Sequence, residues 1–538
     1  MKGQASYLEP GEGRGGFWAG WMLSTDHKRI GVMYLAALLS FFSAGVVLGL
    51  LIRLNLIDPG LVMGPQRYNE VFTTHGIIMI FLFIIPGVPV AFGNFFLPLM
   101  LGANDVAFPR INRLSWWVYL AGATMIAAAL FINGHPPDTG WTFYAPYSIR
   151  THTNVTLAVM GVFVLGFSSI LTGLNFITTV HTMRAPGMTW FRLPLFVWTL
   201  YATAWVQLLA TPVLAITLVF IALGRVFGVG FFDPSRGGDP IIYEHLFWTY
   251  SHPAVYIMIL PAMGIISEVV PVFARKAIFG YKAVAYSAIA IAGVGYLVWG
   301  HHMFTSGMSG KARIIFSLIT FLVAVPSGIK VFNWVATLYR GSIRMDAPLY
   351  FAASFIFLFS LGGLTGLIQS ALAPNLNLHG TYWIVGHFHY VMFGGAGSAL
   401  FTGLHYWFPK MFGKMYSQRR AKIGCLIFFI GFNLLYFPMF ILGLNGMPRR
   451  YFDYPRRYFT GHLISTMGSW VLAAGLIVIF SNLIKALISG EPAPANPWGG
   501  RTLEWQTSSP PPHENFEIPP FLEETGEGKS GFRAGEAG

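Results

Sequence analysis

The chain has 538 residues, of which 54% are hydrophobic and only 10% are charged, and its mean hydropathy is +0.58. Soluble domains carry about a quarter charged residues, so this composition excludes an ordinary water-soluble protein. The formal net charge of +13 does not indicate nucleic acid, because the basic residues gather in alternate loops between apolar runs. The single cysteine, Cys425, excludes disulfides and thiolate metal sites within the chain.

About twelve continuous apolar runs follow one another along the sequence, each long enough to cross a bilayer as a helix. Because hydrophobic residues do not alternate with polar ones, the runs argue against a β-barrel. The predicted fold class is therefore all-α, a polytopic membrane protein with about twelve transmembrane helices. The runs are 29–56, 70–100, 114–133, 153–181, 194–222, 243–270, 282–305, 314–338, 349–372, 384–408, 422–444 and 461–486.

Three regions are expected: a cytoplasmic segment at 1–26, a transmembrane domain at 27–489, and an extended, Pro- and Gly-rich cytoplasmic tail at 490–538. The first region lacks the apolar core of a cleavable signal peptide. Basic loops after alternate spans place both termini in the cytoplasm, and we expect a multi-pass protein of the inner (plasma) membrane. One loop on the opposite side, 447–458, carries four arginines and predicts a bound anion.

Six of the fifteen histidines fall well inside predicted spans. Any one of them alone is best interpreted as a hydrogen-bonded core residue. Six together, with almost no buried carboxylate to balance them, favour metal ligation. They are His75, His252, His301, His302, His387 and His389.

The spacing of these histidines predicts more than one metal centre. His387 and His389 in GHFHY are two residues apart, which is about 200° of rotation on a helix, so they cannot share one metal. This helix would then stand between two centres, and His75 in TTHG can supply a second axial bond to one of them. An iron held by two histidines transfers electrons, whereas an iron held by one keeps a position for a gas.

The other three histidines, His252, His301 and His302, suit copper, zinc or iron. His301 and His302 diverge by about 100° on a regular helix, so both reach one ion only where the helix is distorted. The glycines of HHMFTSGMSG permit such a distortion. Three neutral imidazoles with a vacant position describe a reactive copper.

The motifs VFTTHG, SHPAVY, WGHHMF and VGHFHYV resemble those of subunit I of the haem–copper oxidases, in particular the A-type cytochrome c oxidases. The resemblance runs from STDHKRIGVMY at 24–34 to NPWGGRTLEW at 496–505. It implies the catalytic subunit of a terminal respiratory oxidase, which reduces O2 to water with electrons from cytochrome c and couples this reaction to proton translocation. It also implies two haems of type A or a variant, one low-spin and one high-spin, and one copper ion.

The resemblance assigns ligands residue by residue. His75 and His389 would hold the low-spin haem, His387 the high-spin haem, and the trio His252, His301 and His302 the copper.

Four further residues match the family's pattern around these cofactors. Tyr256 matches the tyrosine that the family cross-links to the first copper histidine, and it follows His252 by one helical turn on the same face. Arg449 and Arg450 match the pair that neutralises haem propionates, with Trp141 nearby.

Protons must reach the site through an apolar interior. Lys330 in VPSGIK is a lone lysine inside a span, with Ser327 one turn earlier, and predicts one proton path. Asp105 in GANDVAFPR would collect protons for a second path. For the polar residues that would continue the second path, ordinary helix packing is an alternative interpretation; they are Asn94, Asn175, Ser168 and Ser169.

The sequence departs from the family at the end of the second path. Most relatives have a glutamate two residues after the first copper histidine, where this chain has Ala254. Some relatives without that glutamate share the pair Tyr250 and Ser251. Because Tyr250 lies four residues before Ala254, its hydroxyl can reach the space of the missing carboxylate. We expect Tyr250 and Ser251 to relay protons through water.

A second departure concerns magnesium. His379 matches a family residue near a magnesium ion between subunits, but Gly380 replaces the aspartate that usually follows, which weakens the prediction of this site.

Partner subunits are needed for electron entry. No Cys/His/Met set for an electron-entry copper centre exists in this chain, so a subunit II would carry it, alongside cytochrome c, subunit III and lipids. The positions that bind quinol in quinol-oxidising relatives match Ala44, Leu48, Arg67 and Glu70 here. These residues argue against a quinol site and favour cytochrome c as the electron donor.

Two other functions compete with this interpretation. A nitric oxide reductase-like subunit also has six histidines but holds a non-haem iron, and it lacks the tyrosine one turn after the first histidine. A multi-span transporter would explain the helices and basic loops but not six placed imidazoles.

Overall fold

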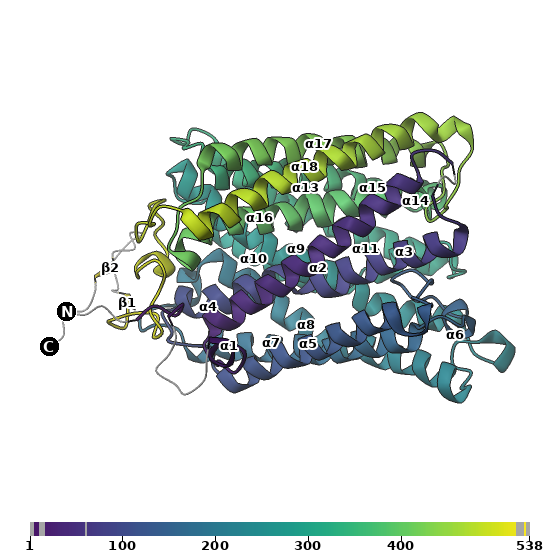
Figure 1. The fold of residues 1–538 in the computed structure, drawn as a ribbon, viewed down its shortest axis with the longest axis horizontal. Helices are drawn as coiled ribbons and strands as arrows, with labels where there is room; N and C mark the ends of the chain where they lie inside the picture. The colour runs from purple at the N-terminus through teal and green to yellow at the C-terminus, as the bar shows by residue number, and fades with distance from the viewer. Residues whose placement is uncertain (1–4, 10–16, 60–61, 523–531, 534–538) are drawn as a thin grey trace.

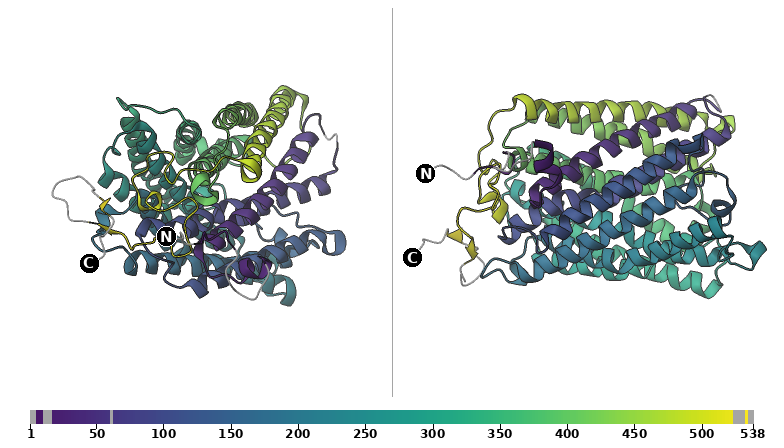
Figure 2. Two further views of the ribbon diagram at one scale, coloured as in Figure 1. Left: turned by 60° about the vertical axis from the view of Figure 1, so that its left-hand side comes forward. Right: turned by 60° about the horizontal axis from the view of Figure 1, so that its bottom comes forward.

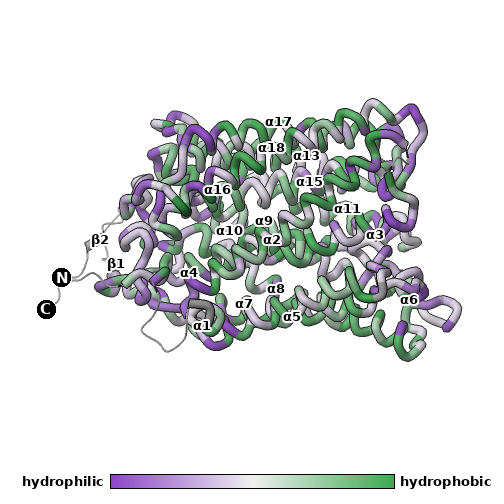
Figure 3. The backbone as a smooth tube through the Cα atoms, viewed as in Figure 1, coloured by the Kyte–Doolittle hydropathy of each residue, from purple (hydrophilic) through white to green (hydrophobic). Residues whose placement is uncertain are grey.

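Long helices packed side by side make up most of the chain (Figure 1). The structure is a computed structural model, which describes residues 5–9, 17–59, 62–522 and 532–533. Hydrophobic residues occupy the middle of the helices, and polar residues gather at the two ends of the bundle (Figure 3). This distribution is that of an integral membrane protein.

The helices and strands have the following bounds. The α-helices are α1 (Phe17–Met22), α2 (His27–Asn55), α3 (Pro65–Ile77), α4 (Asn94–Leu101), α5 (Pro109–Phe131), α6 (Tyr147–Arg150), α7 (Val155–Thr182), α8 (Leu195–Phe227), α9 (Pro240–Ala274), α10 (Tyr281–Tyr296), α11 (Gly310–Leu322), α12 (Ala324–Leu338), α13 (Ala347–Ser370), α14 (Leu372–Leu378), α15 (Tyr382–Val391), α16 (Ser398–Phe412), α17 (Gln418–Leu444) and α18 (Phe459–Ser489). The π-helical segments are η1 (Ile78–Ile84), η2 (Gly87–Gly93) and η7 (Met392–Gly397). The 3-10 segments are η3 (Ile132–Gly134), η4 (Trp190–Arg192), η5 (Pro234–Arg236), η6 (Trp299–Met303), η8 (Arg456–Tyr458) and η9 (Leu503–Trp505), and strand β1 (Phe521–Leu522) pairs antiparallel with β2 (Phe532–Arg533).

The number of membrane crossings agrees with the sequence prediction. Among the described residues, eleven helices are long and apolar enough to cross a membrane. The remaining predicted run, 384–408, lies in the continuous helical stretch formed by α15, η7 and α16. Because α2 begins and α18 ends at the same end of the bundle (Figure 1), the number of crossings is even. This stretch is therefore the twelfth span.

The regular α-helix is interrupted in or directly after the segments that carry the six predicted ligand histidines, except at His252. The π-helical segment η1 directly follows the helix that carries His75, and η7 directly follows the helix that carries His387 and His389. The 3-10 segment η6 contains His301 and His302. Such interruptions are frequent at functional sites, because they rotate side chains relative to the regular helix.

The described part of the tail, 490–522, has little regular structure but packs across one end of the bundle (Figure 2). Trp498 and Trp505 are buried, and the indole nitrogen of Trp498 donates to the carbonyl oxygen of Tyr406 at 2.7 Å. On the same side, the N-terminal segment meets the tail through a bridge between Ser6 and Pro512. The two end segments therefore form one structure on the face where α2 begins.

Glycines allow α17 and α18 to pack backbone against backbone. A Cβ added at Gly431 would overlap the backbone nitrogen of Leu472, and one added at Gly468 would overlap that of Leu435. Close approach at small residues is a main source of association between transmembrane helices, since lipid offers no hydrophobic driving force.

We expect Gly431→Ala to force these helices apart and to destabilise the protein by about 1–3 kcal/mol, as overpacking does in other tightly packed cores. The measurement is the midpoint of thermal unfolding of the purified protein in detergent. Gly293→Ala is the matched control, because a Cβ there would meet no atom within 4 Å. An unchanged midpoint for Gly431→Ala would contradict the expectation.

Candidate active site

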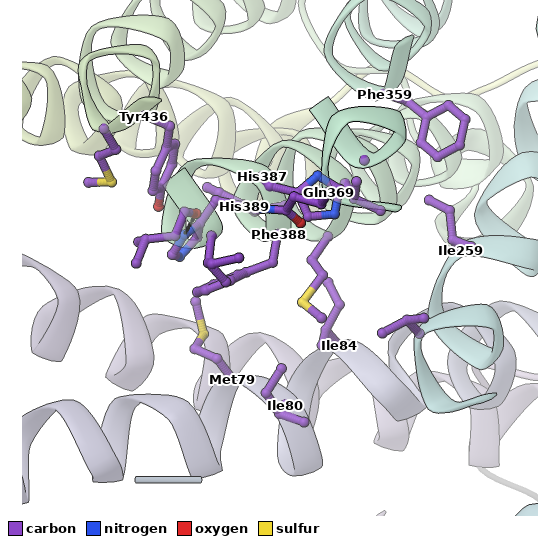
Figure 4. A pocket seen from close by; sticks show the side chains of 18 of the residues that line it. Met79, Ile80, Ile84, Ile259, Phe359, Gln369, His387, Phe388, His389 and Tyr436 are labelled. Atoms are coloured by element: carbon purple, nitrogen blue, oxygen red, sulfur yellow. Dashed lines mark hydrogen bonds between the residues drawn. The ribbon is translucent and has the colours of Figure 1, made fainter. Parts of the chain in front are cut away.

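All six predicted histidines line one cavity of about 930 Å³ inside the bundle. This volume is at the upper end of the range of about 300–1,000 Å³ that is typical of small-molecule sites. Figure 4 shows part of its wall, where His387 and His389 extend from α15 among apolar side chains such as Ile259, Phe359 and Met79. The cavity is thus an apolar space into which a few imidazoles converge.

Three of the histidines form a compact cluster. Nitrogen atoms of His252, His301 and His302 all lie within 4.8 Å of one another. Nδ1 of His252 is 3.1 Å from Nε2 of His302, and the rings of His252 and His301 are perpendicular, with centroids 4.5 Å apart. Three imidazole nitrogens that converge on one point are a ligand set for a transition metal such as copper.

The predicted helix distortion at His301 and His302 is confirmed. Both residues lie in the 3-10 segment η6, between α10 and α11, and not in a regular α-helix. The 3-10 turn brings their ring centroids to 4.2 Å. Two neighbours hold the rings: Trp248 stacks on His302 with centroids 3.7 Å apart, and Thr320 lies within hydrogen-bond distance of His301 at 3.2 Å.

Tyr256 lies against His252, as the helical spacing predicts. Both residues are on α9, and their ring centroids are 4.8 Å apart. Nδ1 of His252 faces His302, whereas its buried Nε2 has no hydrogen-bond partner. Gly295 on α10 makes room for the phenol, because a Cβ there would overlap the ring of Tyr256.

His387 and His389 leave α15 in different directions, also as predicted. Nδ1 of His387 bonds the Gly362 carbonyl oxygen of α13 at 3.0 Å. Nδ1 of His389 bonds the Val385 carbonyl oxygen of its own helix at 2.8 Å, and its ring stacks on Tyr436 of α17 at 4.2 Å. Each ring therefore faces its own part of the cavity.

His75 completes the set from the opposite wall. Its Nδ1 bonds the Gly45 carbonyl oxygen of α2 at 2.8 Å. In all three of His75, His387 and His389, a backbone carbonyl oxygen thus accepts a hydrogen bond from Nδ1–H. The proton stays on Nδ1, so Nε2 has a free lone pair. This is the tautomer and second-shell support typical of metal-ligating histidine, and these residues fit axial ligation of haem iron.

Two arginines and Trp141 line the same cavity at the end away from the tail. Arg449 and Arg450 form no ion pair with a carboxylate of the described residues. Burial, and to a smaller extent the neighbouring Arg449, lower the pKa of Arg450 to about 10. Arg450 has a left-handed backbone with φ of 69° and approaches Gly140, where a Cβ would lie 2.9 Å from the guanidinium. Two half-buried cations without an anion fit carboxylate groups on a ligand.

Arg53 is a cavity residue that sequence reasoning missed. It lies on α2, is 5% exposed, and donates to the His462 carbonyl oxygen at 2.7 Å and to Thr466 at 3.0 Å. Its buried Nε has no partner among the described residues. A lone arginine inside a predicted span was the signal available in the sequence.

Lys330 is buried, as predicted, and Ser327 reaches the cavity. The Lys330 ammonium donates to the Val284 carbonyl oxygen of α10 at 3.0 Å and has no carboxylate partner in the described residues. Ser327 lines the cavity together with Tyr256, whereas Lys330 does not. The lysine therefore lies outside the cavity wall, bonded to α10.

Asp105 lies half-buried in the loop between α4 and α5. Burial raises the pKa of its carboxyl to about 7. Asn175 and Thr179 of α7 hold the same loop: Asn175 accepts from the Phe108 backbone nitrogen, and Thr179 from that of Ala107, both at 2.9 Å. Asn175 is thus a loop anchor. Asn94 is buried above this region with its amide oxygen unpartnered.

A second, smaller cavity of about 40 Å³ connects residues of the predicted second path. Ser168, Ser169 and Tyr250 all line it, so Tyr250 faces the serines as expected. Gln207 of α8 also lines this cavity, and sequence reasoning missed it. The side-chain oxygens of Ser169, Gln207 and Ser251 are buried without a partner. Ser169 and Gln207 line the cavity, and unpartnered oxygens in a cavity of this size call for bound water.

His379 belongs to no group of three potential metal ligands within the described residues. Its Nδ1 contacts the Asn375 amide oxygen at 3.3 Å, and Gly380 has a left-handed backbone with φ of 73°. Within the described part of the chain, no cluster of carboxylates for magnesium therefore includes His379.

Comparison with known proteins adds independent support. The model of the family described as Cytochrome C and Quinol oxidase polypeptide I matches residues 29–493. Cytochrome c oxidase subunit 1 of Synechocystis sp. is 46% identical over 92% of this chain and 90% of that protein. The subunit of the same name is 43% identical in Bacillus subtilis, over 95% of this chain and 82% of that protein. In Cereibacter sphaeroides it is 40% identical, over 95% and 97%.

Among solved structures, a chain of a haem–copper terminal oxidase dimer determined by cryo-EM has the same fold, with a TM-score of 0.76 at 20% identity. The similarity covers 87% of this chain and 85% of that chain. With the family model matching most of the sequence and relatives similar along nearly their whole length, the chain belongs to the haem–copper oxidase family as a subunit I of the cytochrome c and quinol oxidases.

Proposed function

We propose that this chain is the catalytic subunit of a terminal respiratory oxidase, which reduces O2 to water with electrons from cytochrome c and couples the reaction to proton translocation. The observation that carries the proposal is the convergence of six histidines on one apolar cavity, three of them within 4.8 Å of one another and beside Tyr256. Members of this family use haem and copper, which, when bound, supply the electron transfer and the activation of dioxygen.

Each histidine has one role in this proposal. The trio His252, His301 and His302 would hold copper with a vacant position. The Nδ1 hydrogen bonds described above support His387 as the single ligand of a high-spin haem and His75 with His389 as the two ligands of a low-spin haem. Trp248 and Thr320 keep the copper ligands in place.

Tyr256 would provide both an electron and a proton to dioxygen. Its ring lies beside the unpartnered Nε2 of His252, which supports a covalent link between the two rings. A phenol linked to His252 would be held beside the copper ligands. Because it would supply one electron and one proton there, cleavage of the O–O bond would need no other reductant at that moment.

The arginines of the cavity would bind polar substituents at the periphery of the haems. Arg449 and Arg450, near Trp141, match haem propionates in charge and in bidentate geometry. Arg53 would donate from its free Nε to an acceptor on the low-spin haem, which favours a haem with a carbonyl substituent, such as type A.

Two proton paths would serve the site. Lys330 and Ser327 lead toward Tyr256 along α12. The second path begins at Asp105 and passes Asn94, Asn175, Ser168 and Ser169. It would end in water held by Gln207, Tyr250 and Ser251. With Ala254 in place of a glutamate, Tyr250 is the last hydroxyl of this path.

The proposed setting is the inner (plasma) membrane, with the end segments 5–9 and 490–522 in the cytoplasm, because the basic loops lie at their end of the bundle. The propionate-binding arginines then lie on the outer side. A subunit II with an electron-entry copper centre, a subunit III and cytochrome c are the proposed partners. Magnesium at His379 would need oxygen ligands from a partner subunit.

The carboxylate-free cluster argues against a nitric oxide reductase-like site, which tends to place glutamates beside a non-haem iron. In the part of the chain that the structure describes, the one group of three or more potential metal ligands consists of histidines alone. A transporter would not require this convergence.

We expect each copy of this chain to hold two irons and one copper, not counting the copper of subunit II. His302→Asn should lose the copper and nearly all oxygen uptake, because two imidazoles hold copper far more weakly than three. Metal analysis by mass spectrometry and oxygen uptake measure both effects. His405→Asn is the control, since His405 is a buried histidine that lines neither cavity. Iron without copper in the unmodified protein would instead indicate a reductase.

We expect Tyr250→Phe to slow turnover by about tenfold or more, because the last hydroxyl before the missing carboxylate is lost from the proton path. Oxygen uptake and proton release by the complex in sealed vesicles measure turnover and pumping. Tyr201→Phe serves as the control, because Tyr201 contacts His181 at the surface and lines neither cavity. Unchanged turnover and pumping in Tyr250→Phe would count against the proposed relay.

A further inference from the structure

Asn515 in the C-terminal tail joins three segments that are far apart in the sequence. Its side chain is fully buried. The amide oxygen accepts from the Lys28 ammonium at 2.7 Å, at the start of α2. The amide nitrogen donates to the carbonyl oxygens of Ala103 and Asn104 at 2.8 and 3.1 Å. Those two carbonyls directly precede Asp105.

The residues around Asn515 strengthen the same junction. His513 contacts the Asp26 carboxylate through Nδ1 at 3.1 Å, and its carbonyl oxygen accepts from Lys28 at 2.9 Å. His27 contacts the Asn515 amide through Nε2. Tail segment 512–516, here named the tail latch, is thereby fastened to the start of α2 through side chains and backbone.

The loop of Asp105 is consequently held from two sides. Asn175 and Thr179 of α7 bind its later residues, and Asn515 binds its earlier ones. The tail therefore holds the backbone of the two residues that directly precede Asp105.

The backbone conformation at position 515 favours asparagine. Its φ is 66°, in the left-handed region, which among non-glycine residues asparagine tolerates best. A glycine at this position can keep the backbone conformation while removing the side chain, and an aspartate keeps the acceptor while removing both N–H donors.

We propose that the tail latch holds the Asp105 loop in the conformation that collects protons, and that Asn515 is the positioning residue of the latch. The proposal rests on the proposed function, in which Asp105 is the entrance of the second proton path. It adds that a segment outside the membrane helices, at the far end of the sequence, controls this entrance.

The charges at the junction indicate how the latch would affect proton uptake. The pKa of Asp105 is raised to about 7, chiefly by burial and in smaller part by Asp26, while the backbone hydrogen bond from Val106 and the charge of Lys28 oppose the rise. The groups facing Asp105 from α7 are neutral, and the other titratable groups of the junction are His27 and His513. If the loop is released, the carboxyl is hydrated and its pKa falls toward its ordinary value of 3.8. It is then deprotonated at neutral pH, and proton delivery falls off at lower pH than in the unmodified protein.

The test uses the intact oxidase complex carrying Asn515→Gly or Asn515→Asp. Asn496→Gly is the matched control, because the Asn496 side chain bonds only to Gly500 within the tail. Two quantities are measured: hydrogen–deuterium exchange of the amides in loop 102–108, and oxygen uptake as a function of pH. Haem content of each variant reports whether the complex is folded.

The latch predicts about tenfold faster exchange in the loop for both Asn515 variants, since two hydrogen bonds to its carbonyls are lost. It also predicts that the decline of turnover toward high pH moves to lower pH by about one unit or more. The Asn496 variant should match the unmodified complex in both measurements. Loop exchange and a pH profile that stay unchanged in Asn515→Gly, with full haem content, would overturn the latch.

A second experiment, in a protein that carries Asp105→Asn, distinguishes failure of the latch from failure of the proton path. In Asp105→Asn, turnover should be slow already, and adding Asn515→Gly should slow it no further, because the latch acts through Asp105. A further loss in the double variant would overturn action through Asp105. Normal turnover in Asp105→Asn alone would overturn the proton path itself, and with it the control of uptake by the latch, whatever the exchange data show.

Discussion

The cost of burying an imidazole in a membrane interior governs the centre of this protein. In three of the histidines, a hydrogen bond from Nδ1 to a backbone carbonyl oxygen offsets part of this cost. The pairs are His75 with Gly45, His387 with Gly362 and His389 with Val385. The other nitrogen faces the cavity and calls for a metal. Without the carbonyls the rings could rotate and change tautomer, and without a metal the second nitrogen would be left unsatisfied.

Departures from regular helix make the histidine geometry possible. A regular α-helix would send adjacent side chains about 100° apart, so the cluster of His252, His301 and His302 depends on the 3-10 segment that contains the last two. The π-helical segments after His75 and after His389 likewise follow ligand-bearing turns. Glycines have a matching role across helix pairs, because Gly295 admits the phenol of Tyr256 and Gly140 admits Arg450.

In the proposed second proton path, several polar side chains have no hydrogen-bond partner within the protein. Ser169 and Gln207 carry buried oxygens without protein partners in the wall of a cavity large enough for water, and the Ser251 hydroxyl is buried without a partner as well. The entrance has the opposite character, because the loop before α5 is hydrogen-bonded by α7 and by the tail. A rigid entrance and a hydrated interior together would let protons enter at one position and then move through water to the reaction site.

The sequence by itself determined the membrane class, the twelve spans, the six histidines inside the spans and the pairing of Tyr256 with His252, because apolar length, residue type and helical periodicity are local properties. The opposite directions of His387 and His389 followed from periodicity as well. Only the tertiary structure decided which carbonyls orient the rings, that Arg53 and Gln207 line the two cavities, and that Asn515 reaches the loop of Asp105. Those contacts join residues up to several hundred positions apart, and no local pattern encodes which distant backbone a side chain will meet.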